Sequence, residues 1–66
     1  MSRQMTTFYL YRVSTHDPAK LPKIIPSREY GVDGIKDVVG RAQKNYGLEA
    51  DKVEYLYSIE VEWGVF

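Results

Sequence analysis

Three groups of residues in this sequence have types and spacing that could support chemistry. The first is the run Ser14-Thr15-His16-Asp17, which combines hydroxyls, an imidazole and a carboxylate. A catalytic triad needs a base that a third group holds against a nucleophile, and adjacent residues in a turn seldom reach that geometry. Because Pro18 follows directly, the run is more typical of a solvated turn. We therefore predict no catalytic residue and no enzymatic activity.

The second group is acidic and lies near the C-terminus. Glu54, Glu60 and Glu62 fall on alternate positions, so they would share one face of a strand and could, with Asp51, hold a hard cation. Glu60 and Glu62 would be roughly 7 Å apart at strand rise, so one ion would need further ligands. A charged outer face that pairs with Arg12 or with a partner is the simpler interpretation. We predict no metal and no cofactor.

The third group is basic and lies in a proline-bearing loop. Lys20, Lys23 and Arg28 are close in sequence to Tyr30. Such a mixture is typical of single-stranded nucleic-acid binding, because lysine contacts phosphates and bases stack on aromatic rings. The nine Lys and Arg residues are, however, balanced by nine Asp and Glu residues, so a strong electrostatic footprint is missing. Nucleic-acid binding through these four residues is therefore the alternative hypothesis.

Length and composition limit how the chain can be stabilised. Its 66 residues include no cysteine and one histidine, His16, which excludes disulfides and a zinc site built within one chain. A domain of this size buries only about 60% of the surface that its unfolded chain exposes, and a partner subunit is a common remedy. No segment has the length of a signal peptide or a membrane span, so we expect a cytoplasmic protein without membrane contact. Residues 1–5 are expected to be a flexible N-terminus.

The longest pattern is an alternation near the C-terminus. Every second residue there is apolar or aromatic: Val53, Tyr55, Tyr57, Ile59, Val61 and Trp63. Side chains alternate between the two faces of a strand, so this pattern predicts one long strand with a buried face and a wet face.

A first strand is predicted over residues 6–13, which are rich in aromatic and β-branched side chains. Both of its faces are apolar: Phe8 and Leu10 lie on one, and Tyr9, Tyr11 and Val13 lie on the other. Such a strand is usually covered on both faces. The sequence leaves open which face meets the rest of the domain.

Between these strands, the sequence predicts a loop and then one helix. Prolines in the loop permit at most a short edge strand. Asp33 is the predicted N-cap of the helix and Gly47 its C-terminal stop. Gly40 lies inside the helix, either because the helix approaches the sheet closely there or as an unexplained imperfection. Apolar residues recur at helical spacing: Ile35, Val38, Val39, Ala42 and Tyr46.

These elements predict an α+β fold. Residues 1–66 would form a single small domain, in which one helix packs on a short two- to three-stranded sheet in the order strand, loop, helix, strand. If the two long strands are neighbours, the helical crossover predicts that they are parallel. One helix covers one face of a sheet, so we expect the other face, or an edge, to be left for another chain.

The leading functional hypothesis is a small non-enzymatic protein-interaction module. It would be an inhibitor, adaptor or accessory regulator, of the kind that phages and mobile elements encode. The expected partner is another protein, a second copy in a homodimer, or both. The expected interface combines aromatic residues with the acidic row: Tyr9, Tyr11, Arg12, Tyr30, Glu54, Glu60 and Glu62.

Overall fold

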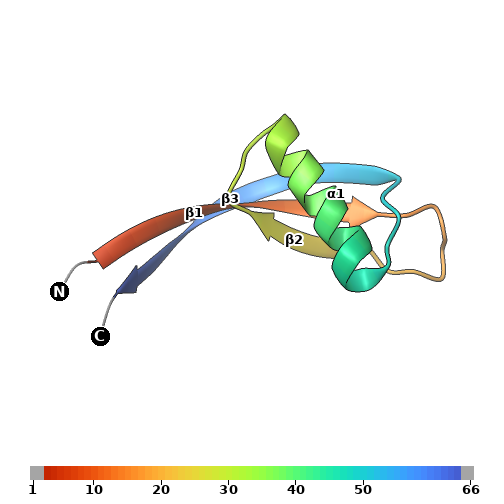
Figure 1. Ribbon diagram of the computed structural model, residues 1–66, viewed down its shortest axis with the longest axis horizontal. Coiled ribbons are helices and arrows are strands. Elements are labelled where there is room, and N and C mark those ends of the chain that lie inside the picture. Colours follow the sequence, from red (N-terminus) through yellow and green to blue (C-terminus); the bar gives the residue numbers. More distant parts are fainter. Residues whose placement is uncertain (1–2, 65–66) are drawn as a thin grey trace.

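Within residues 3–64, three strands form one antiparallel sheet and one helix lies across a face of it (Figure 1). This is a computed structural model that describes residues 3–64, with side chains from Gln4 to Glu62. The elements in chain order are β1 (Arg3–Ser14), β2 (Lys23–Ser27), α1 (Val32–Tyr46) and β3 (Lys52–Gly64). The predicted α+β class is confirmed, and the loop contains the short edge strand that its prolines permit.

The central strand of the sheet is β1, because the strand order is β2-β1-β3. Both neighbours pair with β1 in the antiparallel sense. The predicted parallel pairing of the two long strands is therefore wrong. The physical reason is β2: the chain reverses direction once before it enters the helical crossover, so the crossover relates β2 to β3 rather than β1 to β3.

The core lies between α1 and the sheet face that it covers. Its buried apolar residues come from β1, β2, α1 and the segment after the helix: Tyr11, Val13, Ile25, Val38, Ala42 and Leu48. Val53 of β3 packs against them. Of the predicted helical stripe, Val38 and Ala42 are buried, whereas Ile35 and Tyr46 are exposed. The helix therefore contacts the sheet along a narrower line than its sequence pattern suggested.

The helix starts two residues earlier than predicted. Its N-cap is Gly31, which has φ 75° and makes no side-chain cap hydrogen bond, so the prediction of Asp33 as N-cap is wrong. The positive φ explains why glycine precedes the helix at this point, since L-residues with a side chain avoid that region. Asp33 lies in the first turn instead, where its negative carboxylate interacts favourably with the positive end of the helix dipole.

The predicted end of the helix at Gly47 is confirmed. Gly47 adopts the left-handed conformation, with φ 61°. Its N–H donates to the carbonyl of Gln43 at 3.0 Å, and the N–H of Leu48 donates to the carbonyl of Ala42 at 3.1 Å. These bonds satisfy carbonyls of the last turn, and they turn the chain so that Leu48 enters the core.

The close approach between helix and sheet occurs at Gly34, not at Gly40. The Tyr11 hydroxyl donates to the carbonyl of Glu29 at 3.1 Å, and this pair lies directly against the backbone of Gly34. A Cβ atom at Gly34 would overlap both groups, whereas a Cβ atom at Gly40 would meet nothing within 4 Å. Burial raises the pKa of Tyr11, so its hydroxyl stays protonated and remains the donor.

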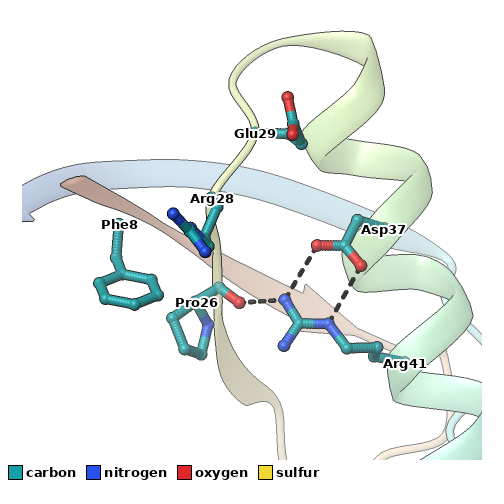
Figure 2. A pocket seen from close by; sticks show the side chains of 6 residues that line it. All are labelled: Phe8, Pro26, Arg28, Glu29, Asp37 and Arg41. Atoms are coloured by element: carbon teal, nitrogen blue, oxygen red, sulfur yellow. Dashed lines mark hydrogen bonds and ion pairs between the residues drawn. The ribbon is translucent and has the colours of Figure 1, made fainter. Parts of the chain in front are cut away.

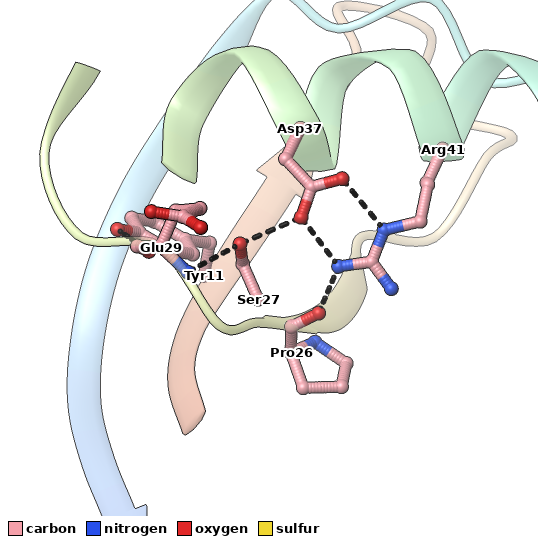
Figure 3. A network of polar contacts seen from close by, with 6 residues as sticks. All are labelled: Tyr11, Pro26, Ser27, Glu29, Asp37 and Arg41. Atoms are coloured by element: carbon pink, nitrogen blue, oxygen red, sulfur yellow. Dashed lines mark hydrogen bonds and ion pairs between the residues drawn. The ribbon is translucent and has the colours of Figure 1, made fainter. Parts of the chain in front are cut away.

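A polar network attaches β2 to α1 (Figure 3). The buried Ser27 hydroxyl donates to Asp37 Oδ2 at 2.6 Å and accepts the N–H of Glu29 at 3.1 Å. Arg41 donates to both carboxylate oxygens of Asp37, at 3.1 and 3.0 Å, and also to the carbonyl of Pro26. The Ser27 hydrogen bond, with Arg41, holds the pKa of Asp37 below its ordinary value although burial opposes this.

This network predicts an acid-sensitive contribution to stability. Because the pKa of Asp37 is lower in the folded state, its carboxylate stabilises the fold above the ordinary pKa of 3.8. That contribution is lost as the pH falls through the lower pKa of the folded state. We expect the difference in unfolding free energy between the native chain and Asp37→Asn to shrink between pH 5 and pH 2, measured by urea unfolding. A difference that stays constant across this range would contradict the assignment.

The two long strands continue past the rest of the domain as a two-stranded arm (Figure 1). Pairing of β1 with β2 reaches only to Tyr9, opposite Ser27, whereas pairing of β1 with β3 continues to Arg3, opposite Gly64. We call residues 3–8 and 59–64 the arm. The predicted flexible N-terminus is thus wrong for residues 3–5, which belong to β1, while residues 1 and 2 lie outside the described part.

Candidate protein-interaction surface

The candidate site is the face of the sheet that turns away from α1. Tyr11 and Val13 point toward the helix and are buried. Side chains alternate along a strand, so Phe8, Leu10 and Arg12 point to the opposite face. This settles the alternative that the sequence left open: Phe8 and Leu10 lie outside the core, and Tyr11 and Val13 lie within it.

A β-bulge changes which residues of β3 accompany them. Leu10 is opposite Tyr57, but its neighbour Tyr11 is opposite Tyr55, so Leu56 is an extra residue on β3. An extra residue reverses the facing of every side chain beyond it. The prediction of a single apolar row on one face of this strand is therefore wrong.

The apolar row divides at the bulge. Val53 and Tyr55 lie on the helix side, whereas Tyr57, Ile59 and Val61 lie beside Phe8 and Leu10; the Trp63 side chain lies outside the described part. Pro26 of β2 is opposite Leu10 and shares this side. We call the resulting apolar surface the open face, made of Phe8, Leu10, Pro26, Tyr57, Ile59 and Val61.

The charged residues of β3 divide at the same point. Glu54 is opposite Arg12 and forms an ion pair with it at 3.7 Å, at one end of the open face. Glu60 and Glu62 lie on the other side of the arm, opposite Thr7 and Met5. The prediction that the three glutamates share a face is wrong, although the predicted cross-strand pairing of a carboxylate with Arg12 is confirmed.

The open face is accessible as well as apolar. Tyr57 is 57% exposed, Ile59 39% and Val61 38%, while Phe8 and Leu10 are partly buried. Within the strands, the charged side chains next to this face are the Arg12 and Glu54 pair. Arg28, which follows β2, lies near Phe8 and Pro26 at the hollow described below. A contiguous exposed apolar surface of this kind is typical of an interaction site, whereas scattered exposed apolar residues are not.

Four tyrosines gather on the helix side, where the arm meets the helix. Ring centroids are 5.2 Å apart for Tyr9 and Tyr30, 5.4 Å for Tyr30 and Tyr55, and 5.7 Å for Tyr11 and Tyr55. Tyr11, which the sequence places in the expected interface, is only 1% exposed and packs in the core. Tyr30 is 64% exposed and stays accessible, while Tyr9 is partly buried beneath it.

The predicted nucleic-acid residues are spread along β2. Lys20 precedes this strand and Lys23 begins it, whereas Arg28 and Tyr30 follow its end. Five residues of strand span about 16 Å, so the two pairs lie at opposite ends. Lys23 is further occupied by the ring of Tyr46, 5.3 Å from its ammonium nitrogen. The structure does not gather these groups into one patch.

A shallow hollow of about 400 Å³ opens where β2 ends (Figure 2). Six residues line it: Phe8, Pro26, Arg28, Glu29, Asp37 and Arg41. Figure 2 shows the rings of Phe8 and Pro26 near each other, with Asp37 and Arg41 approaching from the helix. Asp37 and Arg41 are bonded to each other there, and no hydroxyl, thiol or imidazole side chain is among the residues that line the hollow.

The His16 region forms the predicted turn. The Asp17 carboxylate accepts the N–H of Ala19 at 2.9 Å, and the Asp17 carbonyl accepts the N–H of Lys20 at 3.0 Å. Among the described residues, no three metal-ligating side chains come together. No helix within residues 3–64 has the length and apolar character needed to cross a membrane.

Most residues of the open face are absent from the interface that the sequence predicts. The sequence leaves open whether Phe8 and Leu10 or the opposite face of the first strand meets the helix. It predicts that Tyr57, Ile59 and Val61 lie on a buried face. A bulge is often marked by glycine, but here the extra residue is Leu56, which has no distinctive local signal. One signal was present in the sequence: both faces of the first strand are apolar, and a single helix can cover only one of them.

No family model matches the chain, and no curated protein or solved structure is significantly similar to it.

Proposed function

We propose that this chain is a small non-enzymatic protein-interaction module that binds an apolar protein surface through the open face. It would act as an inhibitor, adaptor or accessory regulator of its partner. One observation supports this above all others. The open face gathers six apolar side chains, and no element within residues 3–64 covers it.

The composition of the open face indicates the chemistry of the partner. It is one face of a sheet, and the side chains on it carry no charge between Thr6 and Leu10 of β1 or between Tyr57 and Val61 of β3. A complementary surface is apolar and broad, such as another sheet or the apolar side of a helix. The Arg12 and Glu54 pair at one end would orient the partner along the strands.

The energetics favour reversible binding. Full burial of one apolar side chain contributes about 1.5–3 kcal/mol. Association costs about 4–15 kcal/mol in lost freedom. Because Phe8 and Leu10 are already partly buried and Ile59 and Val61 are only 39% and 38% exposed, only a fraction of that gain remains, and it is similar in size to the cost. This suits a regulator that binds and leaves better than a permanent subunit.

A charge placed on the open face should abolish partner binding. We expect immobilised native chain to retain a specific protein from the extract of its source cells, and Ile59→Lys to lose that protein by at least ten-fold. Ile59 is at the surface, and the lysine stem can lie along Phe8, so the fold should persist. The measurement is quantitative mass spectrometry of the retained proteins.

The matched control is Leu21→Lys. Leu21 is a highly exposed apolar residue in the loop before β2, away from the open face, so this variant makes the same chemical change elsewhere. It should retain the partner as the native chain does. Equal retention by all three chains, or equal loss in both variants, would contradict the proposed role of the open face.

A further inference from the structure

One edge of the sheet, separate from the open face, is left unpaired, and what it could bind goes beyond the proposed function. β1 is longer than its neighbour β2, whose pairing stops at Tyr9. From Gln4 to Phe8, β1 keeps β3 on one side, but within the described residues no strand lies on its other side. We call this edge of residues 4–8 the slot.

Pro26 shows which backbone groups of β1 face the slot. Directly opposed residues in an antiparallel pair alternate between those that exchange two hydrogen bonds and those that exchange none. Pro26 has no N–H and is opposite Leu10, so that pair exchanges none, and Tyr9 bonds to β2 instead. By the same alternation, Met5 and Thr7 direct their N–H and C=O groups into the slot.

The outer edge of β2 is closed to another strand. It is only five residues long, and Lys23 places a charge at its start. The backbone groups of Pro26 point outward, but proline has no N–H to offer, and its carbonyl already accepts a hydrogen bond from Arg41. Prolines, charges and short length are the means by which natural sheets prevent edge pairing.

The outer edge of β3 is protected by charge. By the alternation of paired residues, Ser58, Glu60 and Glu62 direct their backbone groups away from β1. Two copies paired antiparallel through this edge near the arm would bring their glutamates together, and like charges directly opposed are destabilising. The slot differs from both outer edges, because Gln4 to Phe8 contain neither a charge nor a proline.

We propose that the slot binds the same segment of a second copy of this chain. The two β1 strands would pair antiparallel about a two-fold axis at Thr6, with Met5 of each copy opposite Thr7 of the other. Both residues would then exchange N–H···O=C bonds across the seam, four in all. The seam ends at Gln4 and Phe8, because the next position, opposite Tyr9, is already held by Ser27, so Arg3 of the incoming strand turns away there. From Gln4 to Phe8 the opposed side chains are uncharged, so no like charges meet within the seam.

The second copy also remedies a weakness of the arm. An isolated two-stranded ribbon is marginally stable in water, whereas three or more strands with an apolar face hold together. Pairing through the slot makes the arms into a four-stranded sheet and joins their open faces into one surface. At the inner end of the slot, Phe8 also lines the hollow where β2 ends (Figure 2).

A proline in the slot tests this pairing. Thr7→Pro removes an N–H that faces the slot and that makes no bond to β3, so the fold should persist while the seam loses its hydrogen bonds. We expect the native chain to sediment at twice the 7.7 kDa of one chain at high micromolar concentration, and Thr7→Pro to sediment as a monomer. Circular dichroism should show that both chains are folded.

The matched control is Ser58→Pro, which makes the same change at the outer edge of β3. Ser58 lies opposite Tyr9 on the other side of the same ribbon, and its variant should remain dimeric. A monomeric native chain at about 1 mM, a dimeric Thr7→Pro or a monomeric, folded Ser58→Pro would overturn the proposal. Ile59→Lys should leave the dimer intact, so failure of this inference is distinguishable from failure of the proposed function.

Discussion

Tyr11→Ala should leave a large fraction of the chain unfolded at 25 °C. Tyr11 is a large, fully buried side chain of the central strand, and it packs against both the tyrosine cluster and the core. Truncation of a buried aromatic residue to alanine costs about 3–5 kcal/mol. At about 0.05–0.15 kcal/mol per residue, a chain of this length has only about 3–10 kcal/mol in total.

Urea unfolding followed by circular dichroism would measure this loss. Tyr11→Phe is the control that separates the ring from its hydroxyl. It keeps the ring but removes the donor to the Glu29 carbonyl, and we expect a loss of about 1–2 kcal/mol. A Tyr11→Ala variant that loses no more stability than Tyr11→Phe would show that the ring is not central to the core.

Gly34→Ala should destabilise the chain although it lies in a helix, where alanine is normally the better residue. The new Cβ atom would overlap the Tyr11 hydroxyl and the Glu29 carbonyl, so either the helix must move away from the sheet or the hydrogen bond must break. Overpacking of this kind costs about 1–3 kcal/mol. It outweighs the helix preference of about 1 kcal/mol for alanine over glycine.

Gly40→Ala is the matched control, because it makes the same substitution six residues later in the same helix. A Cβ atom at Gly40 would enter open space, so only the helix preference acts and stability should rise by up to about 1 kcal/mol. The two variants should therefore shift the urea midpoint in opposite directions. Shifts of the same sign would contradict the close approach at Gly34.

The two proposed surfaces share one origin. A single short helix covers only the part of the sheet that β2 also flanks, so the arm has no cover on either side and the open face continues along it. The bulge at Leu56 then decides how the arm is used. It places Ile59 and Val61 beside Phe8, and it moves Glu60 and Glu62 to the other side. If the strand alternated without the bulge, Ile59 and Val61 would lie on the helix side and the two glutamates would lie beside Phe8.

Local patterns in the sequence determined the elements of this protein. Alternation predicted β3, and aromatic and β-branched residues predicted β1. Apolar spacing predicted the helix, and the left-handed preference of glycine predicted its end at Gly47. Each of these signals depends on residues only a few positions apart. The same is true of the turn at Asp17, whose carboxylate bonds two residues along the chain.

The tertiary structure decided what the sequence could not, because those features depend on distant partners. Gly34 and Gly40 both lie within the helix, and only the positions of the Tyr11 hydroxyl and the Glu29 carbonyl make one of them necessary. The bulge at Leu56 exists because β1 pairs with β3 in one register from Arg3 to Leu10 and in a register shifted by one residue from Tyr11 to Ser14. That register, set by long-range pairing, determines which side chains form the open face and which edge of the arm stays uncharged.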